Sequence, residues 1–368
     1  MKKRGTELLS LILLFFAGCG TDAMEEISIS GSWDLVGFEG ENIQFVRSEG
    51  HAFYLATETE IYRSEDLSDW TSQNMSQILK EGEKVRDFLV FSETEILGVV
   101  LFKDETSPEE SEQYWDNFVS LFRTTDGGEN WEPLYNEFTE NEAYVNSVSA
   151  DSELQNTYAV HGGNVARSLD RGLSWSPVHW FDDDKKWVPH TNVGNINVNP
   201  FDSSVIWAFG SNLVTRPQII RTIDEGETWD IFNPNFSDGF GGGPVRDVLF
   251  SPGNRDKSLI GTGNSIQLTP DSGETWERVY DGGRILALVN GTVTDEAVYA
   301  SGRLFDGSDA GKLFLNFTPD FGRNWQTFIY EDGPDDVRVN ALSSTEVNGQ
   351  ETVLLATTKG LFSFSVIL

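Results

Sequence analysis

The stretch Leu268-Thr-Pro-Asp-Ser-Gly-Glu-Thr-Trp276 decides the fold, because its pattern occurs five times in the chain. In each copy a Ser or Thr is followed at fixed offsets by Asp, Gly, a small polar residue and Trp. The other copies are Arg123-Thr-Thr-Asp-Gly-Gly-Glu-Asn-Trp131, Arg167-Ser-Leu-Asp-Arg-Gly-Leu-Ser-Trp175, Arg221-Thr-Ile-Asp-Glu-Gly-Glu-Thr-Trp229 and Phe317-Thr-Pro-Asp-Phe-Gly-Arg-Asn-Trp325. The Asp can accept hydrogen bonds from the N–H groups of a tight turn, Gly supplies positive φ, and Trp fills the core. Each copy therefore predicts a β-hairpin corner.

This pattern resembles the Asp-box of sialidase-type repeats, which is structural in its families and implies no chemistry. The residues given this structural role are Asp126, Asp170, Asp224, Asp271 and Asp320, with Trp131, Trp175, Trp229, Trp276 and Trp325. From residue 43 the chain repeats a four-strand unit with a period of roughly 45 to 60 residues, a range typical of propellers and solenoids. In each unit the third strand leads into the Asp-box, and the fourth is expected to start at Trp.

The first and last repeats are irregular. Glu65-Asp-Leu-Ser-Asp-Trp70 is an Asp-box shortened by one residue. The C-terminus supplies three strands and stops where a fourth should begin, and Ser32-Trp33-Asp-Leu-Val36 looks like that missing strand. Docking it there leaves few open sheet edges. We therefore predict an all-β, seven-bladed β-propeller over residues 31–368, closed by three C-terminal strands and one N-terminal strand. The alternative is six blades with residues 31–70 as an irregular cap.

The N-terminus is typical of an exported lipoprotein. Met-Lys-Lys-Arg precedes an apolar run from Leu8 to Ala17, which is too short for a membrane span and reads as a signal peptide over residues 1–18. The run ends in Phe16-Ala-Gly-Cys19, which resembles a lipobox, so Cys19 is the predicted lipidation site and residues 19–30 an acidic tether. This predicts a lipid-anchored protein of the bacterial cell envelope, at the outer membrane. Ordinary secretion is the alternative.

The charge excludes some partners. The net charge of −33 repels nucleic acid and anionic head groups. The four histidines have no metal-ligand spacing, so neither a metal nor a cofactor is expected. The protein is expected to be a monomer, and the acidic surface reads either as a solubility feature or as a site for a cation or basic partner.

The long loops are predicted to share one face. In a propeller, turns between strands two and three and links between blades lie opposite the Asp-box turns. The long segments there are 102–117, 182–194, 210–217, 233–244, 302–312 and 331–336. Because long loops commonly carry recognition, this long-loop face is the predicted binding face, with neutral loop growth as the alternative.

Arginines and one aromatic loop are the candidate binding residues of this face. Arg86, Arg246 and Arg338 begin three innermost strands, with Arg284 as a fourth candidate at the channel mouth, and Arg216 and Arg303 lie in long loops. Arginine grips carboxylates and phosphates with its planar fork. The alternative is that each pairs with a neighbouring acid such as Asp87 or Asp247. The linker with Trp180, Trp187 and His190 reads as a sugar-stacking or calcium-binding loop, although its spacing matches no known calcium loop. The alternative is that its aromatic side chains pack down.

Resemblance leaves two function classes open. The repeats are similar to those of sialidases, sortilin, xyloglucan-type endoglucanases and the photosystem II assembly factor. Sialidases need a Phe-Arg-Ile-Pro motif that is missing here, and no Tyr–Glu pair or carboxylate pair can be assigned from the sequence. Similarity to bacterial relatives of the assembly factor implies a non-catalytic propeller that binds a protein or glycan, whereas a glycoside hydrolase is the alternative.

Overall fold

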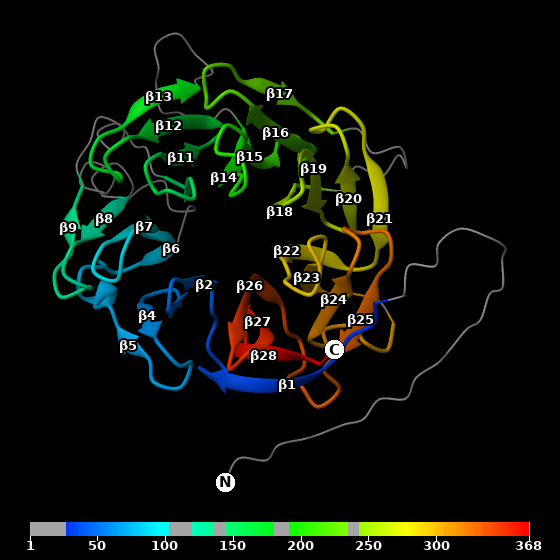
Figure 1. Ribbon diagram of the computed structural model, residues 1–368. Helices are drawn as coiled ribbons and strands as arrows, with labels where there is room; N and C mark the ends of the chain where they lie inside the picture. The colour runs from blue at the N-terminus through cyan, green and yellow to red at the C-terminus, as the bar shows by residue number, and fades with distance from the viewer. Residues whose placement is uncertain are drawn as a thin grey trace, which may run out of the picture.

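The computed structural model describes residues 27–102, 120–134, 145–179, 191–234, 243–305 and 307–367. They form seven four-stranded antiparallel sheets around one axis (Figure 1). The chain is therefore a seven-bladed β-propeller, as predicted, and the six-bladed alternative is wrong.

In chain order, each blade runs from an inner to an outer strand. Blade 1 has β2 (Phe45–Glu49), β3 (Ala52–Ala56), β4 (Ile61–Ser64) and β5 (Thr71–Ser72), followed by the 3₁₀ helix η1 (Met75–Gln77). Blade 2 has β6 (Glu83–Val90), β7 (Ile96–Phe102), β8 (Leu121–Thr124) and β9 (Glu132–Pro133). Blade 3 has β10 (Ser147–Ala150), β11 (Thr157–His161), β12 (Asn164–Ser168) and β13 (Ser176–His179). Blade 4 has β14 (Asn192–Val198), β15 (Ile206–Ser211), β16 (Pro217–Thr222) and β17 (Asp230–Phe232).

Blades 5 to 7 complete the ring. Blade 5 has β18 (Asp247–Ser251), β19 (Asn254–Gly261), β20 (Ser265–Thr269) and β21 (Glu277–Asp281). Blade 6 has β22 (Arg284–Asn290), β23 (Val298–Arg303), β24 (Phe314–Thr318) and β25 (Gln326–Ile329). Blade 7 has β26 (Val339–Val347), β27 (Gln350–Thr357) and β28 (Gly360–Ile367), with β1 (Ser30–Gly37) as its outer strand. The outer strands of blades 1 to 6 begin one residue after the Trp, not at it, because the indole belongs to the turn.

The strand β1 joins the two ends of the chain. It pairs antiparallel with β28, so that Trp33 lies opposite Phe364. The Trp33 ring stacks on Tyr330 of blade 6, with centroids 5.4 Å apart, and meets Phe364 edge-on. The first strand of the chain thus contacts the last two blades.

The Asp-box turns are closed by local hydrogen bonds. In blade 5 the Asp271 carboxylate accepts from the Thr269 and Thr275 hydroxyls and from the Thr275 N–H. The indole N–H of Trp276 donates to the Gly273 carbonyl at 2.9 Å. Ser272 and Gly273 both have positive φ, 57° and 98°, so the turn needs one more left-handed residue than the sequence pattern suggests.

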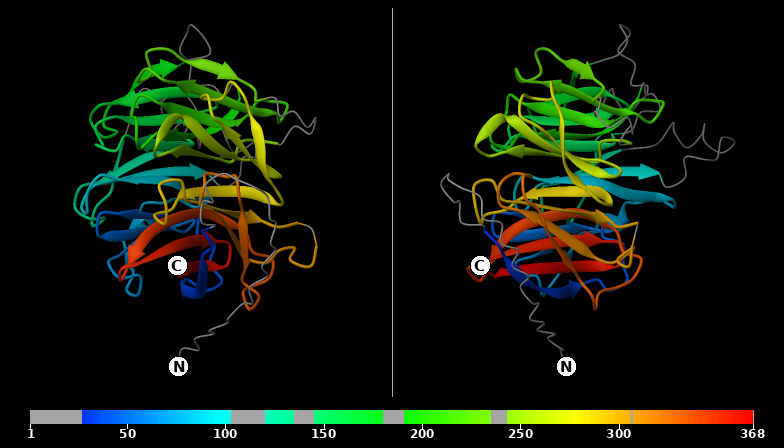
Figure 2. Two further views of the ribbon diagram at one scale, coloured as in Figure 1. Left: turned by 45° about the vertical axis from the view of Figure 1, so that its right-hand side comes forward. Right: turned by 90° about the vertical axis from the view of Figure 1, so that its right-hand side faces the viewer.

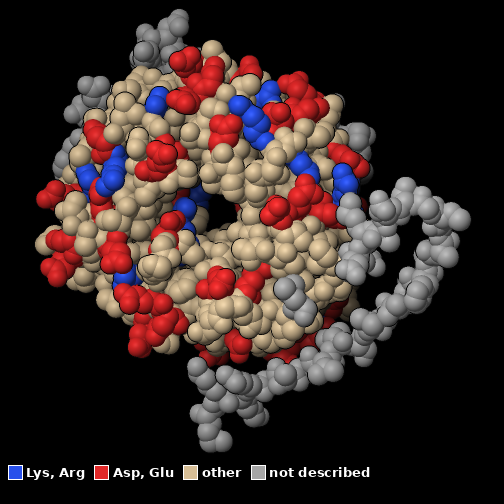
Figure 3. All heavy atoms as spheres, in the orientation of Figure 1, with Lys and Arg blue, Asp and Glu red and all other residues tan. Residues whose placement is uncertain are grey.

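The core is divided among the blade interfaces. Each of the seven hydrophobic clusters of described residues lies between two neighbouring sheets. The sheets stack side by side around the axis (Figure 2). The C end lies at the Asp-box edge of blade 7, and the turned views place it on the side that faces the viewer in Figures 1 and 3.

Candidate functional site

Three arginines hold the same position in blades 2, 5 and 7. Each follows a buried valine whose backbone N–H donates to the preceding blade: Val85 to Glu58, Val245 to Gly210 and Val337 to Gly311. These bonds set the start of each inner strand on the side opposite the Asp-box turns. Each of these valines is buried, whereas the arginine that follows it is exposed or half-buried.

The structure brings Arg246, Arg284 and Arg338 of blades 5, 6 and 7 together. The pKa of Arg246 is lowered, first by burial and then by the positive charges of Arg284 and Arg338. Within the described residues none of the three forms an ion pair, and Arg338 instead donates from Nε to the Asn340 side chain at 2.9 Å. We call these three residues the arginine group. No acid among the described residues forms an ion pair with these three positive charges.

Arg284 is also tied to an aromatic side chain. Its guanidinium lies 5.1 Å from the Phe305 ring centre, and that of Arg303 lies 5.6 Å from the same ring. Arg303 pairs with Asp336 at 2.6 Å, so it is neutralised where Arg284 is not. Phe305 is 46% exposed. Sequence reasoning missed Phe305, although it lies in the predicted loop 302–312.

The acids named as alternative partners serve other groups. Asp87 pairs with Arg47 at 2.9 Å and accepts from Ser147 and Val148 of the next blade. Asp247 accepts from the N–H groups of Val248 and Leu288, at 2.8 and 2.7 Å. Both carboxylates therefore link neighbouring inner strands, and neither neutralises the arginine that precedes it.

Burial raises the pKa of Asp247 to about 7, against its hydrogen bonds from Leu288, Val248 and Asn197. Since the folded-state pKa lies above the unfolded value of about 4, this group's contribution to stability is complete below pH ~4 and is lost as the pH rises through ~7. We expect Asp247→Asn to remove this dependence, so that wild type loses about 2–4 kcal/mol relative to the variant between pH 4 and 8. Urea denaturation across this range measures it. The control is Asp295→Asn at an exposed position, for which the difference in unfolding free energy from wild type should not change with pH. The same result for Asp247→Asn would contradict the assignment.

The other predicted residues lie apart from the arginine group or outside the described residues. Arg86 belongs to blade 2, which does not adjoin blades 5 to 7. Arg216 is exposed in the β15–β16 turn, and Arg303 is the register partner of Arg284. Trp180, Trp187, His190 and Cys19 lie outside the described residues.

A Tyr–Glu pair exists, but in the wrong place for sialidase-type chemistry. The Tyr299 hydroxyl lies 3.1 Å from the Glu351 carboxylate, at the beginnings of β23 and β27, which are their Asp-box ends. Tyr299 is fully buried, and burial together with the Glu351 charge raises its pKa. A nucleophile needs access and a lowered pKa. This pair is therefore structural, and the arginine group lies at the opposite end of the strands.

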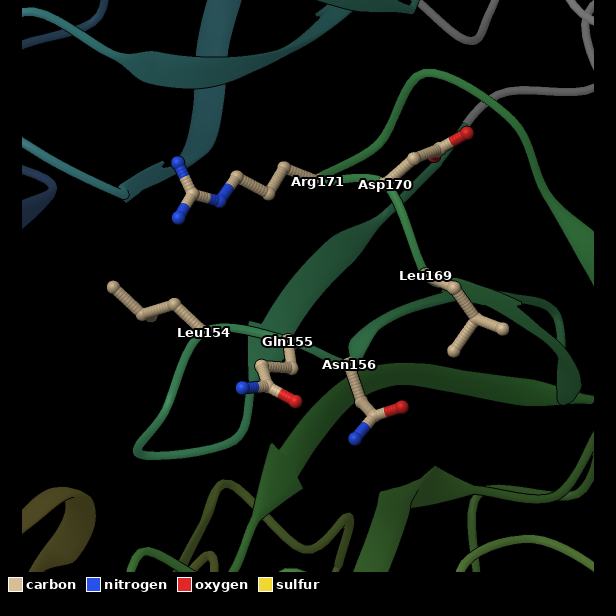
Figure 4. A pocket seen from close by; sticks show the side chains of 6 residues that line it. All are labelled: Leu154, Gln155, Asn156, Leu169, Asp170 and Arg171. Atoms are coloured by element: carbon tan, nitrogen blue, oxygen red, sulfur yellow. The ribbon is translucent and has the colours of Figure 1, made fainter.

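The Asp-box face carries two pockets. Figure 3 shows this face dotted with acidic residues and hollowed at the axis, with basic atoms on the wall of the hollow. One pocket, of about 400 Å³, is lined by Leu154, Gln155, Asn156, Leu169, Asp170 and Arg171 of blade 3 (Figure 4). Its Arg171 is held by Glu95 at 2.7 Å. The second, of about 530 Å³, lies between blades 4 and 5.

The described ranges offer neither a metal-binding cluster nor a membrane-spanning helix. No group of three or more His, Cys, Asp or Glu side chains there is arranged to hold a metal ion. None of the helices there has the length and apolar character that crossing a membrane requires.

The fold defines the chain as a seven-bladed β-propeller, and the comparisons with solved structures agree with that fold. No protein-family profile matches the sequence, and no curated protein matches it. Among solved structures, the chain is similar to YCF48 from Cyanidioschyzon merolae, with 14% identity, a TM-score of 0.60 and coverage of 90% of this chain and 98% of that one.

Two larger proteins contain a similar propeller. The GH74 xyloglucanase from Xanthomonas campestris has 15% identity and a TM-score of 0.59, over 89% of this chain and 43% of the enzyme. The extracellular domain of BT4673 from B. thetaiotaomicron has 12% identity and a TM-score of 0.61, over 91% of this chain and 40% of that chain. This chain thus spans less than half of either protein. At such identities the likeness establishes the fold alone, which serves both enzymes and non-enzymes.

Proposed function

We propose that this chain is a non-catalytic, envelope-anchored lipoprotein whose propeller binds a protein or glycan partner through the long-loop face. The observation that carries the proposal is the arginine group, which has no acidic partner among the described residues although the protein has a net charge of −33. A carboxylate or phosphate on a partner would find a matching set of donors there.

The position of β1 supports a long-loop face that is accessible to a partner when the N-terminus is anchored. Ser30, the first residue of β1, pairs with Ile367 at the Asp-box edge of blade 7. The segment that precedes β1 therefore joins the ring on the side opposite the arginine group. A lipid anchor at Cys19 would leave the long-loop face directed away from the membrane.

The test uses the full-length protein and poly-L-glutamate as a defined anionic probe. We expect the triple variant R246Q/R284Q/R338Q to lower affinity for the probe at least tenfold, because three charge-assisted donors are lost. A triple variant that binds as wild type does would contradict the proposal.

The matched control is Arg323→Gln, which changes the same charge at an exposed position in the Asp-box turn of blade 6. We expect less than a twofold effect. If R323Q instead weakens binding by a third or more of the free-energy change in the triple variant, which removes three charges, then the probe responds to net charge and not to a specific site.

A further inference from the structure

A second site lies on the Asp-box side, where β17 of blade 4 meets the Asp-box turn of blade 5. This blade 4–5 pocket has a volume of about 530 Å³, within the range of pockets that hold small ligands. Its lining includes Arg221, Asp230, Phe232, Asn233, Thr275 and Trp276. With Glu274, the pocket thus combines one cation, two carboxylates, two aromatic rings and several small polar groups.

The guanidinium of Arg221 has unused donors. Its side chain is only 10% exposed, and the buried Nε and Nη1 atoms have no hydrogen-bond acceptor among the described residues. Its Nη2 is 2.7 Å from Glu274, whose side chain is 71% exposed. A buried donor without an acceptor among the described residues is costly and needs an explanation, and a bound ligand is one source of such an acceptor.

The aromatic wall is built by close packing of the two blades. The Arg221 guanidinium lies 4.9 Å from the centre of the Phe232 ring. Gly273 allows this ring to approach the turn, because a Cβ there would come within 2.7 Å of it. The half-buried Trp276, three residues after Gly273, also lines the pocket. Aromatic surface beside polar groups suits a ligand with an apolar face and a polar edge.

The arginine at the same position in another repeat has a different kind of acidic partner. Arg123 precedes the Asp-box Thr of blade 2 as Arg221 does in blade 4, and it is held by Glu95. The Glu95 side chain is only 13% exposed and also binds Arg171. Glu95 is therefore fixed by two arginines, whereas Glu274 is a solvated side chain that can leave its arginine at little cost.

We propose that the blade 4–5 pocket binds a hexuronate residue of an acidic glycan. The sugar carboxylate takes the place of Glu274 on Arg221, and the C–H face of the ring packs against Phe232 and Trp276. The hydroxyl groups of the sugar then donate to the Asp230 carboxylate and form hydrogen bonds with the side chains of Asn233 and Thr275. This site is independent of the arginine group and lies on the other side of the ring.

The experiment is titration of the full-length protein with oligogalacturonate, a neutral galactose oligosaccharide of equal length, and poly-L-glutamate, at constant ionic strength. We expect the uronate to bind at least tenfold more tightly than the neutral sugar, and Arg221→Gln to lower its affinity at least tenfold. Glu274→Gln should raise it severalfold, because a competing carboxylate is removed. Arg123→Gln should change it less than twofold.

Several results would overturn the proposal. Equal binding of the neutral and acidic sugars would do so. Binding of poly-L-glutamate without binding of the uronate would also do so, and would indicate an acidic protein segment as the ligand. If Arg221→Gln does not fold, Glu274→Gln still tests the proposal. An unchanged or lower uronate affinity in that variant contradicts the displacement of Glu274 from Arg221 by the sugar carboxylate. Loss of uronate binding only in the R246Q/R284Q/R338Q variant would move the ligand to the long-loop face.

Discussion

Replacing Trp33 by alanine is expected to destabilise the propeller by about 2–4 kcal/mol, which is the cost of removing a large packed side chain. The indole stacks on Tyr330 with an interplanar angle of 4° and meets Phe364 at 5.0 Å, so it holds β1 against both blade 6 and blade 7. Its loss loosens the outer strand of the last blade and exposes a sheet edge. Urea denaturation measures the change, and limited proteolysis reports whether β1 has detached.

Leu35→Ala is the matched control for Trp33→Ala. Leu35 lies on the same strand two residues further on but is 41% exposed, so its truncation removes little buried surface. We expect a loss of about 1 kcal/mol or less. Equal losses in the two variants would mean that Trp33 does not join the blades, and that any weakening of β1 has the same effect.

The Gly302→Ala variant is expected to lose about 3 kcal/mol and to weaken anion binding together with stability. Gly302 lies opposite Ile285 in the β22–β23 ladder, where the register shifts between Ile285 and Ala287. A Cβ at this position would lie 1.9 Å from the backbone oxygen of Arg284, which cannot move as a flexible side chain does. The inner strand must shift, and Arg284 shifts with it.

Thermal denaturation and titration with poly-L-glutamate measure the two effects of Gly302→Ala. Gly253→Ala is the control, because no atom lies within 4 Å of the added Cβ and its φ is not in the left-handed region. We expect that variant to stay within about 0.5 kcal/mol of wild type. A Gly302→Ala protein that is stable and binds normally would show that the bulge is not needed to place Arg284.

Much of the fold could be predicted because the decisive contacts are local. In the Asp-box turns, the carboxylate of Asp271 bonds groups only two and four residues away, so the residue pattern alone specifies the corner. The repeated corners, spaced by one four-strand unit, then imply a ring of blades. What the pattern did not show was the second left-handed residue, Ser272, because no Gly marks it.

The candidate sites depend on distant residues and could be predicted only in part. Arg246, Arg284 and Arg338 were individually recognisable from their place at the start of inner strands, but the proximity of these three, without Arg86, depends on which blades are neighbours. The Arg221–Glu274 pair joins residues 53 positions apart, and no periodicity indicates it.

The sequence by itself determined the class of fold and the corners, because these follow from short-range hydrogen bonding and from alternation along strands. The choice between six and seven blades was decided by the long-range pairing of β1 with β28. Only the tertiary structure decided which charges are neutralised: Asp87 by Arg47, Arg303 by Asp336, and the arginine group by no acid among the described residues. Charge pairing acts through space across blade interfaces. It is therefore set by the angular order of the sheets around the axis, which the order of residues along the chain does not express.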